Sequence, residues 1–161
     1  MAKISLVRVD FRLIHGQVVA KWLKQTQATK IIIVNSTLAK DPTMSNIYKM
    51  ATPANVKCSI VDIDTFVAAW EKNQLGEGIA LILFKDVGTT VQAWKKGFPL
   101  EQLQIGGLGA GPGRKAVYQN MTLNKEDAAM LKELSGGGVK VFFQATPEDK
   151  QMEFEKVDLN F

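Results

Sequence analysis

Short apolar segments alternate with helical patterns along most of the chain, and this alternation restricts the folds that it can adopt. The apolar segments span residues 4–9, 30–34, 56–61 and 79–84, followed by weaker ones at 103–106 and 139–143. Two of them, KIIIV and IALILF, are almost continuously apolar, which is typical of strands buried on both faces of a parallel sheet. The order of the segments predicts an α/β fold with an open, mostly parallel, doubly wound sheet of about six or seven strands and helices on both faces.

Helical spacing appears in five segments between these strands, at 15–25, 41–53, 62–73, 86–97 and 124–138. Asp41 followed by Pro42 is a typical helix start, and Asn124 is the expected cap of the last helix. Between 107 and 123 we expect a loop. The fragment MEFEKV (152–157) alternates in polarity, so it is expected either to add an antiparallel edge strand or to pair with a second copy of the chain.

Length and composition indicate one ordinary globular domain. The 161 residues, 46% hydrophobic and 22% charged, show no internal repeat and no long linker, so we expect a single domain over 1–161. Cys58 is the only cysteine, which excludes an intrachain disulfide and fits a reducing cytosol. One cysteine and one histidine argue against a structural zinc site, and neither a metal nor a cofactor is expected.

Charge and hydropathy limit the partners. The net charge is +4 and the lysines are scattered, so the sequence does not indicate nucleic-acid binding. No segment approaches the ~20 apolar residues of a membrane-spanning helix, so any membrane association is expected to come through a partner. A homodimer is compatible with the sequence, which does not specify it.

The segment VRVDFRLIHGQVV, residues 7–19, contains the only histidine of the chain and two of its three arginines. His15 follows the first expected strand and precedes the first expected helix, where free backbone N–H groups attract anions. Arg8 and Arg12 carry guanidinium groups, which suit bidentate phosphate binding better than lysine does. Asp10 supplies a carboxylate that can orient an arginine or the imidazole.

Temporary carriage of phosphate is the chemistry best matched to this segment. A neutral imidazole can attack a phosphoryl group, and two guanidinium groups can stabilise the developing charge without a metal ion. Gly16, which gives the backbone room beside the ring, and Gln17 are expected to support the phosphate. No nucleophile-elbow sequence is present, which argues against a hydrolase. The simpler alternative is that His15 only caps the helix or fills a surface gap.

RVDFRLIHGQV (8–18) closely resembles the active-site signature of the IIB subunits of the bacterial sugar phosphotransferase system, in the mannose/fructose/sorbose family. KDP, YKMATPANVK, LQIGGLGAGPGRKAVYQNMTL and LNKEDAAMLKELSGGGVKVFFQATPEDK follow in the order that this family uses. The resemblance implies that His15 is phosphorylated through Nδ1. It also implies that Arg8 and Arg12 bind the phosphoryl group while Asp10 fixes their geometry.

The resemblance further implies a protein-Nπ-phosphohistidine–sugar phosphotransferase of the cytoplasm, bound peripherally to the membrane through its partners. Such a subunit takes phosphate from a phosphohistidine on a separate IIA protein. It passes the phosphate to a sugar imported through the membrane subunits IIC and IID. N-acetylgalactosamine or another amino sugar is the first expectation for that sugar, and mannose the second. The sequence departs from the family at Asn35-Ser36, where acidic residues are common, and in its glycine-rich stretch 106–114.

Three alternatives stay open. Gly106–Gly113 is expected to be a mobile loop, although it can also form a phosphate-binding nest or a surface for IIA, which Arg114 could join. The same histidine loop would serve a non-catalytic module that senses phosphate on a partner. A flavodoxin-like nucleotide-binding protein follows from fold analogy alone.

Overall fold

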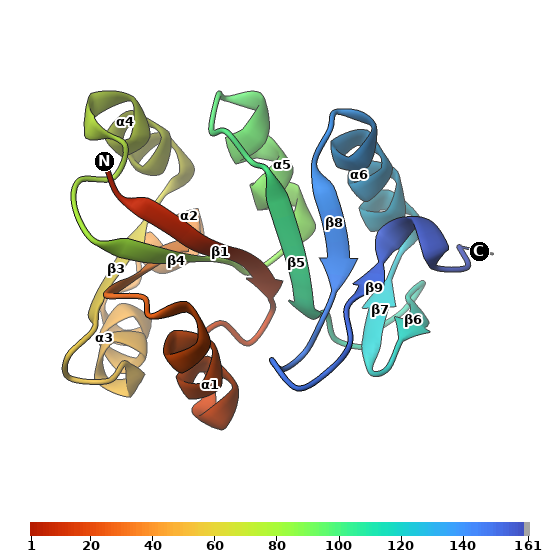
Figure 1. Cartoon of the computed structure of the whole chain (residues 1–161), viewed down its shortest axis with the longest axis horizontal. Coiled ribbons are helices and arrows are strands. Elements are labelled where there is room, and N and C mark those ends of the chain that lie inside the picture. Colours follow the sequence, from red (N-terminus) through yellow and green to blue (C-terminus); the bar gives the residue numbers. More distant parts are fainter. Residues whose placement is uncertain (160–161) are drawn as a thin grey trace.

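A seven-stranded sheet forms the centre of the protein, with strand order β3-β2-β4-β1-β5-β8-β9 (Figure 1). The structure, a computed structural model, describes residues 1–159 and, for Gln17, the backbone only. The strands are β1 (Lys3–Asp10), β2 (Lys30–Val34), β3 (Lys57–Val61), β4 (Ile79–Phe84), β5 (Gln102–Gly107), β8 (Lys140–Phe143) and β9 (Met152–Glu153). All neighbouring pairs are parallel except β8 and β9. The predicted mostly parallel sheet is confirmed.

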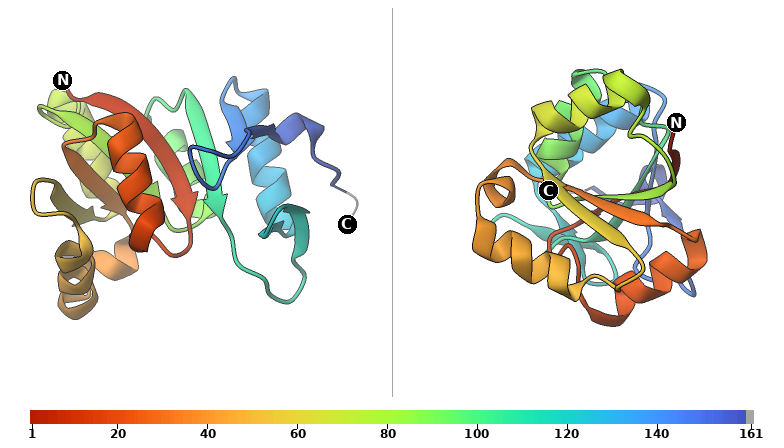
Figure 2. Two further views of the ribbon diagram at one scale, coloured as in Figure 1. Left: turned by 60° about the horizontal axis from the view of Figure 1, so that its bottom comes forward. Right: turned by 90° about the vertical axis from the view of Figure 1, so that its left-hand side faces the viewer.

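Helices cover both faces of the sheet, as the doubly wound prediction requires (Figure 2). They are α1 (Gly16–Thr26), α2 (Ser36–Ala39), α3 (Pro42–Ala51), α4 (Ile63–Asn73), α5 (Val87–Lys95) and α6 (Lys125–Gly136). Helices α1 to α3 pack with Ile31, Leu81 and their neighbours in one apolar cluster. Helices α4 to α6 pack on the opposite face in a second cluster, which contains Ile32 and Ile82. Alternate residues of β2 and β4 thus contribute to two separate cores.

Capping side chains fix the helix starts that the sequence indicated. The Asp41 carboxylate accepts a hydrogen bond from the backbone N–H of Met44 at 3.1 Å, and Pro42 is the first residue of α3. The Asn124 side chain accepts from the backbone N–H of Asp127 at 2.7 Å at the start of α6. Both caps satisfy N–H groups that the helix itself leaves without acceptors.

Other elements differ from the prediction. The expected loop over 107–123 contains an antiparallel hairpin of β6 (Lys115–Tyr118) and β7 (Met121–Leu123). The tail forms the antiparallel edge strand β9, but only Met152 and Glu153 pair with β8 before a 3₁₀ helix, Phe154–Lys156, begins. The strand is short because Phe154 turns into the core, where it is 4% exposed.

Strand register places the end of β1 between two other strand ends. Val9 lies beside Phe84 of β4 and Ile105 of β5, and Asp10 lies beside Gly107. The carboxyl ends of parallel strands are where open α/β sheets bind their ligands. The loop 11–15 therefore leaves β1 at the edge where a functional site is expected. Within the described residues, no helix has the length and apolarity needed to cross a membrane.

Candidate functional site

Asp10 is the centre of the polar cluster that follows β1. Its side chain is fully buried, and its two oxygens contact the side chains of Arg8, Arg12 and His15. Oδ2 lies 2.9 Å from Nε2 of His15 and accepts from Nη2 of Arg8 at 3.1 Å. Oδ1 accepts from the backbone N–H and from Nε of Arg12, at 3.0 and 3.3 Å. The four predicted residues are thus brought together by one carboxylate.

The surroundings of Asp10 keep this carboxyl group ionised. Burial raises its pKa, but the hydrogen bond from His15 and the positive charge of Arg8 lower it more, so the pKa lies below its ordinary value. An ionised carboxylate has no proton to donate. The proton in the contact between Asp10 and His15 therefore lies on Nε2, and Nδ1 is the ring nitrogen that keeps a lone pair in the neutral imidazole.

His15 stands at the N-terminus of α1, but its side chain does not cap the helix. It occupies the N-cap position with extended backbone, and its side chain makes no capping hydrogen bond. Its side chain is 21% exposed, and Asp10 is its hydrogen-bond partner. The simpler alternative of a helix-capping histidine is therefore wrong. The ring is held by a buried group on one side while part of it reaches solvent.

Arg8 is buried and does not lie where its side chain could bind a phosphate from solvent. It is 2% exposed, and both of its terminal nitrogens donate to protein acceptors. Nη1 donates to Gln104 Oε1 and to the carbonyl of Gln144, and Nη2 donates to Asp10 and to the carbonyl of Ala145. The guanidinium also lies over the ring of Trp22, 5.5 Å from its centroid. The expectation that Arg8 contacts phosphate is corrected, because its terminal donors are already used inside the protein.

Arg12 is the arginine that solvent can reach. Its side chain is 45% exposed, and among the described residues it forms its ion pair through Nε, with Asp10. The guanidinium lies over the exposed ring of Phe11, 5.4 Å from the centroid. Its terminal nitrogens are therefore available to an anion that approaches the loop.

Two glycines of β5 make room for this cluster, and the sequence did not indicate their role. A Cβ atom at Gly106 would lie 1.9 Å from Cζ of Arg8, and one at Gly107 would lie 2.9 Å from Oδ1 of Asp10. Both residues are in a strand rather than in the expected mobile loop. Gly16 was expected to give room beside the ring, but a Cβ there would meet nothing within 4 Å. Glycine is favoured at this position because its φ is +46°, a conformation that other residues rarely adopt.

The sequence also matches a known family. The profile of the PTS system sorbose subfamily IIB component matches residues 4–160. The chain belongs to this family of phosphotransferase-system IIB components. Proteins of this kind take part in phosphoryl transfer during sugar uptake.

Individual relatives agree with the family match. The sorbose-specific EIIB component of Lacticaseibacillus casei is 36% identical, and the alignment covers 91% of this chain and 89% of the relative. The crystal structure of manxB from Thermoanaerobacter tengcongensis superposes with a TM-score of 0.90 at 34% identity, covering 96% of this chain and 94% of the other. The predicted fold and the predicted family are both confirmed.

The comparisons do not favour the amino sugar that the sequence suggested first. An N-acetylgalactosamine-specific IIB component of Escherichia coli is 24% identical over 98% of this chain and 99% of the relative. This identity is lower than that of the sorbose-specific relative.

Two other predicted contributors are Arg114, whose side chain lies apart from the Asp10 cluster, and Gln17. Arg114 forms an ion pair with Asp127 at 2.6 Å and donates to Thr122, so it fastens the hairpin to the start of α6 instead of joining the Asp10 cluster. The side chain of Gln17 lies outside the described part of the structure. Its backbone belongs to the first turn of α1.

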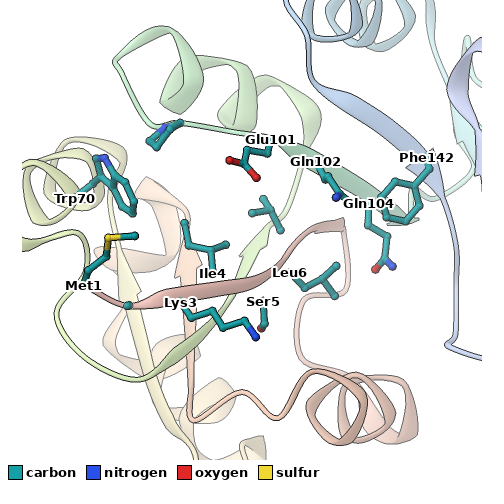
Figure 3. A pocket seen from close by; sticks show the side chains of 13 residues that line it. Met1, Lys3, Ile4, Ser5, Leu6, Trp70, Glu101, Gln102, Gln104 and Phe142 are labelled. Atoms are coloured by element: carbon teal, nitrogen blue, oxygen red, sulfur yellow. The ribbon is translucent and has the colours of Figure 1, made fainter.

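A cleft of about 610 Å³ opens between β1 and β5, but its lining does not include Asp10, Arg12 or His15 (Figure 3). The two strands pair only from Arg8 and Gln104 onward, so they are separated at their amino ends. Among the described residues, no group of three or more metal-ligating side chains is found. The His15 side chain lies outside this cleft and is partly exposed at the surface.

Proton linkage gives a test of the Asp10 cluster. Because the pKa of Asp10 is lowered by folding, its contribution to stability is present above about pH 4 and is lost as the pH falls through its lower folded value. Asp10→Asn removes this contribution and leaves the buried charge of Arg8 without its carboxylate, so we expect a loss of about 3 kcal/mol at pH 7. The loss should shrink at pH 3, as measured by urea unfolding.

Glu71→Gln is a suitable control, because Glu71 is an exposed carboxylate on α4. This variant should unfold like the wild type at both pH values. A destabilisation of Asp10→Asn that stays constant from pH 7 to pH 3 would contradict the ionised state of Asp10.

Proposed function

We propose that this IIB component carries a phosphoryl group on Nδ1 of His15, between a IIA donor and a sugar. The observation that supports this is the 2.9 Å contact between Asp10 Oδ2 and His15 Nε2. Because the carboxylate accepts a hydrogen bond from Nε2–H, the lone pair of the neutral ring is on Nδ1. The buried partner also restricts the orientation of the ring, so the ring is already oriented before the attack begins.

The proposed reaction has two balanced steps. In the first, the Nδ1 lone pair attacks phosphorus, and the bond from phosphorus to the donor imidazole breaks with its electron pair staying on that donor nitrogen. In the second, a sugar hydroxyl oxygen attacks the same phosphorus. The bond to Nδ1 then breaks, its electrons return to the His15 ring, and the hydroxyl proton leaves to solvent or to a base at the acceptor site.

Charge stabilisation is assigned to Arg12 and to the start of α1. The terminal nitrogens of Arg12 can bind the transferring oxygens, as the half-exposed position of its side chain allows. The backbone N–H groups of Gly16 and Gln17 lie in the first helical turn, where they lack intrahelical acceptors and attract anions. Arg8 is given a positioning role, through Asp10.

The partners follow from the family. The donor is a IIA protein phosphorylated on histidine, and the acceptor is the 6-hydroxyl of a sugar held by the membrane subunits IIC and IID. The IIB component then works at the cytoplasmic side of the membrane while bound to those subunits. A hexose or amino sugar of the sorbose, fructose, mannose or N-acetylgalactosamine type is the substrate class that the relatives' names suggest.

The test is to phosphorylate the protein and to locate the phosphate by NMR. His15 is the only histidine, so labelling with [15N]histidine gives a spectrum from a single ring. After incubation with phosphorylated IIA, we expect one phosphate bound to Nδ1, labile in acid and stable in alkali. A phosphate on Nε2, or none on His15, would contradict the proposal.

A further inference from the structure

Two buried glutamines extend the polar cluster away from the surface. Gln104 of β5 is 1% exposed and Gln144, directly after β8, is 7% exposed. Gln104 accepts from Nη1 of Arg8 through Oε1, and its Nε2 donates to Gln144 Oε1 at 3.2 Å. Gln144 in turn donates to the backbone carbonyl of Asp149 at 2.9 Å. We call the five side chains of Gln144, Gln104, Arg8, Asp10 and His15 the polar chain.

The direction of every hydrogen bond in the polar chain is determined by its members. Arg8 can only donate, so Gln104 must present its oxygen to it and its NH₂ group to Gln144. The backbone carbonyl of Asp149 can only accept, so Gln144 must present its NH₂ group there and its oxygen to Gln104. Both amides are thus fixed in one orientation by groups at opposite ends.

The same constraints continue to the imidazole. Nη2 of Arg8 donates to Asp10 Oδ2, the oxygen that also contacts Nε2 of His15. Nη1 of Arg8 donates hydrogen bonds to Gln104 and to the Gln144 carbonyl. Nη2 donates to Asp10 and to the Ala145 carbonyl. The rotation of the guanidinium is therefore fixed by four acceptors, and one of them is the carboxylate that orients His15.

We propose that Gln104 and Gln144 are positioning residues for phosphoryl transfer, because they hold Arg8 in the orientation that keeps Asp10 aimed at His15 Nε2. The inference rests on the proposed function of His15. Neither glutamine touches the reacting atoms. Without the Gln104 oxygen, one N–H of Arg8 loses its acceptor, and the guanidinium turns to satisfy it at the expense of the bond to Asp10.

Gln104→Met tests this role, since methionine has a similar length and no strong acceptor. The cleft between β1 and β5 borders Gln104, so the substituted side chain has space (Figure 3). Gln102→Met is the matched control: it is the same change two residues away on β5, at an exposed position that lines the same cleft. Both variants are compared in the intact protein.

Two readouts separate a positioning role from a merely structural one. In the 15N spectrum of neutral His15, we expect the wild type and Gln102→Met to show a protonated Nε2 and an unprotonated Nδ1, and Gln104→Met to shift toward a mixture of tautomers. At saturating phosphorylated IIA, the phosphorylation rate of Gln104→Met should fall about 10-fold while the KM for the donor stays within about twofold.

Gln144→Met keeps the test decisive if Gln104→Met fails to fold. It preserves the backbone carbonyl of Gln144 that accepts from Arg8, and it removes the side-chain acceptor of Gln104 together with the donor to the Asp149 carbonyl. We expect the same tautomer shift with a smaller, about threefold, loss of rate. A folded variant whose tautomer and rate equal those of the wild type would overturn the proposal. If wild-type His15 takes no phosphate, the proposed function fails, whereas the tautomer comparison still decides the role of the glutamines.

Discussion

His15→Ala is expected to abolish phosphorylation of the protein by phosphorylated IIA. His15 is the only imidazole in the chain, and in the proposed reaction its Nδ1 lone pair forms the bond to phosphorus. No other residue of the cluster replaces it, because Asp10 is buried and the arginines are not nucleophiles. With radiolabelled donor, acid-labile phosphate on the variant should lie below the detection limit, whereas the wild type should approach one phosphate per chain.

The fold is expected to survive this change, so loss of label will report on the chemistry. The ring is partly exposed and its hydrogen bond is with Asp10, so its removal should cost about 1–2 kcal/mol. Asp10 also keeps its bonds to Arg8 and Arg12. Circular dichroism and a thermal unfolding curve provide the check.

His15→Gln is the sharper control, because the glutamine amide can donate to Asp10 much as Nε2 does but offers no nucleophilic nitrogen. We expect it to take no label while still binding IIA. A variant of this kind that supports normal regulation in the cell would favour the non-catalytic phosphate sensor instead. Acid-labile label that persists on either variant would place the phosphate on a residue other than His15.

The sequence predicted the strands and helices well because their signals are local. The apolar segments at 30–34 and 79–84 coincide with β2 and β4, and the caps at Asp41 and Asn124 form as expected. The hairpin of β6 and β7 was missed because its strands have four and three residues, too few for a periodic pattern.

The candidate site was predicted only in part because its interactions are not local. Asp10, Arg12 and His15 lie close together in the chain, at the end of β1 and in the loop that follows it, and their proximity follows from the sequence. The partners of Arg8 do not, since Gln104 and Gln144 are 96 and 136 residues away in the chain. Alternation along β1 places Arg8 on the face opposite Val7 and Val9, but no pattern indicates which side chains meet it there.

Gly106→Ala is expected to damage both stability and function, although residue 106 contacts neither phosphate nor partner in the proposed reaction. The added methyl would lie 1.9 Å from Cζ, 2.2 Å from Nη2 and 2.4 Å from Nε of Arg8. The guanidinium cannot simply move aside, because it is buried and held by four acceptors. Displacing it breaks the bond to Asp10, at a cost of about 3–5 kcal/mol.

This cost should lower the melting temperature by about 10 °C and the phosphorylation rate of the remaining folded protein by about 100-fold. Gly136→Ala provides the matched control. Gly136 is the last residue of α6, and a Cβ there would meet nothing within 4 Å. This control should leave the rate unchanged and the stability equal or higher by up to about 1 kcal/mol, since alanine favours the helix.

A double-mutant cycle identifies the cause of the damage. If the methyl acts by displacing the guanidinium, Gly106→Ala should cost little in a protein that already carries Arg8→Ala, because the atoms it would strike are gone. In urea unfolding, the double mutant should then be about 3 kcal/mol more stable than the sum of the two single changes predicts. Equal costs in both backgrounds would mean that β5 itself rejects the side chain. In that case the glycine would be required by the strand rather than by the buried arginine that contacts Asp10.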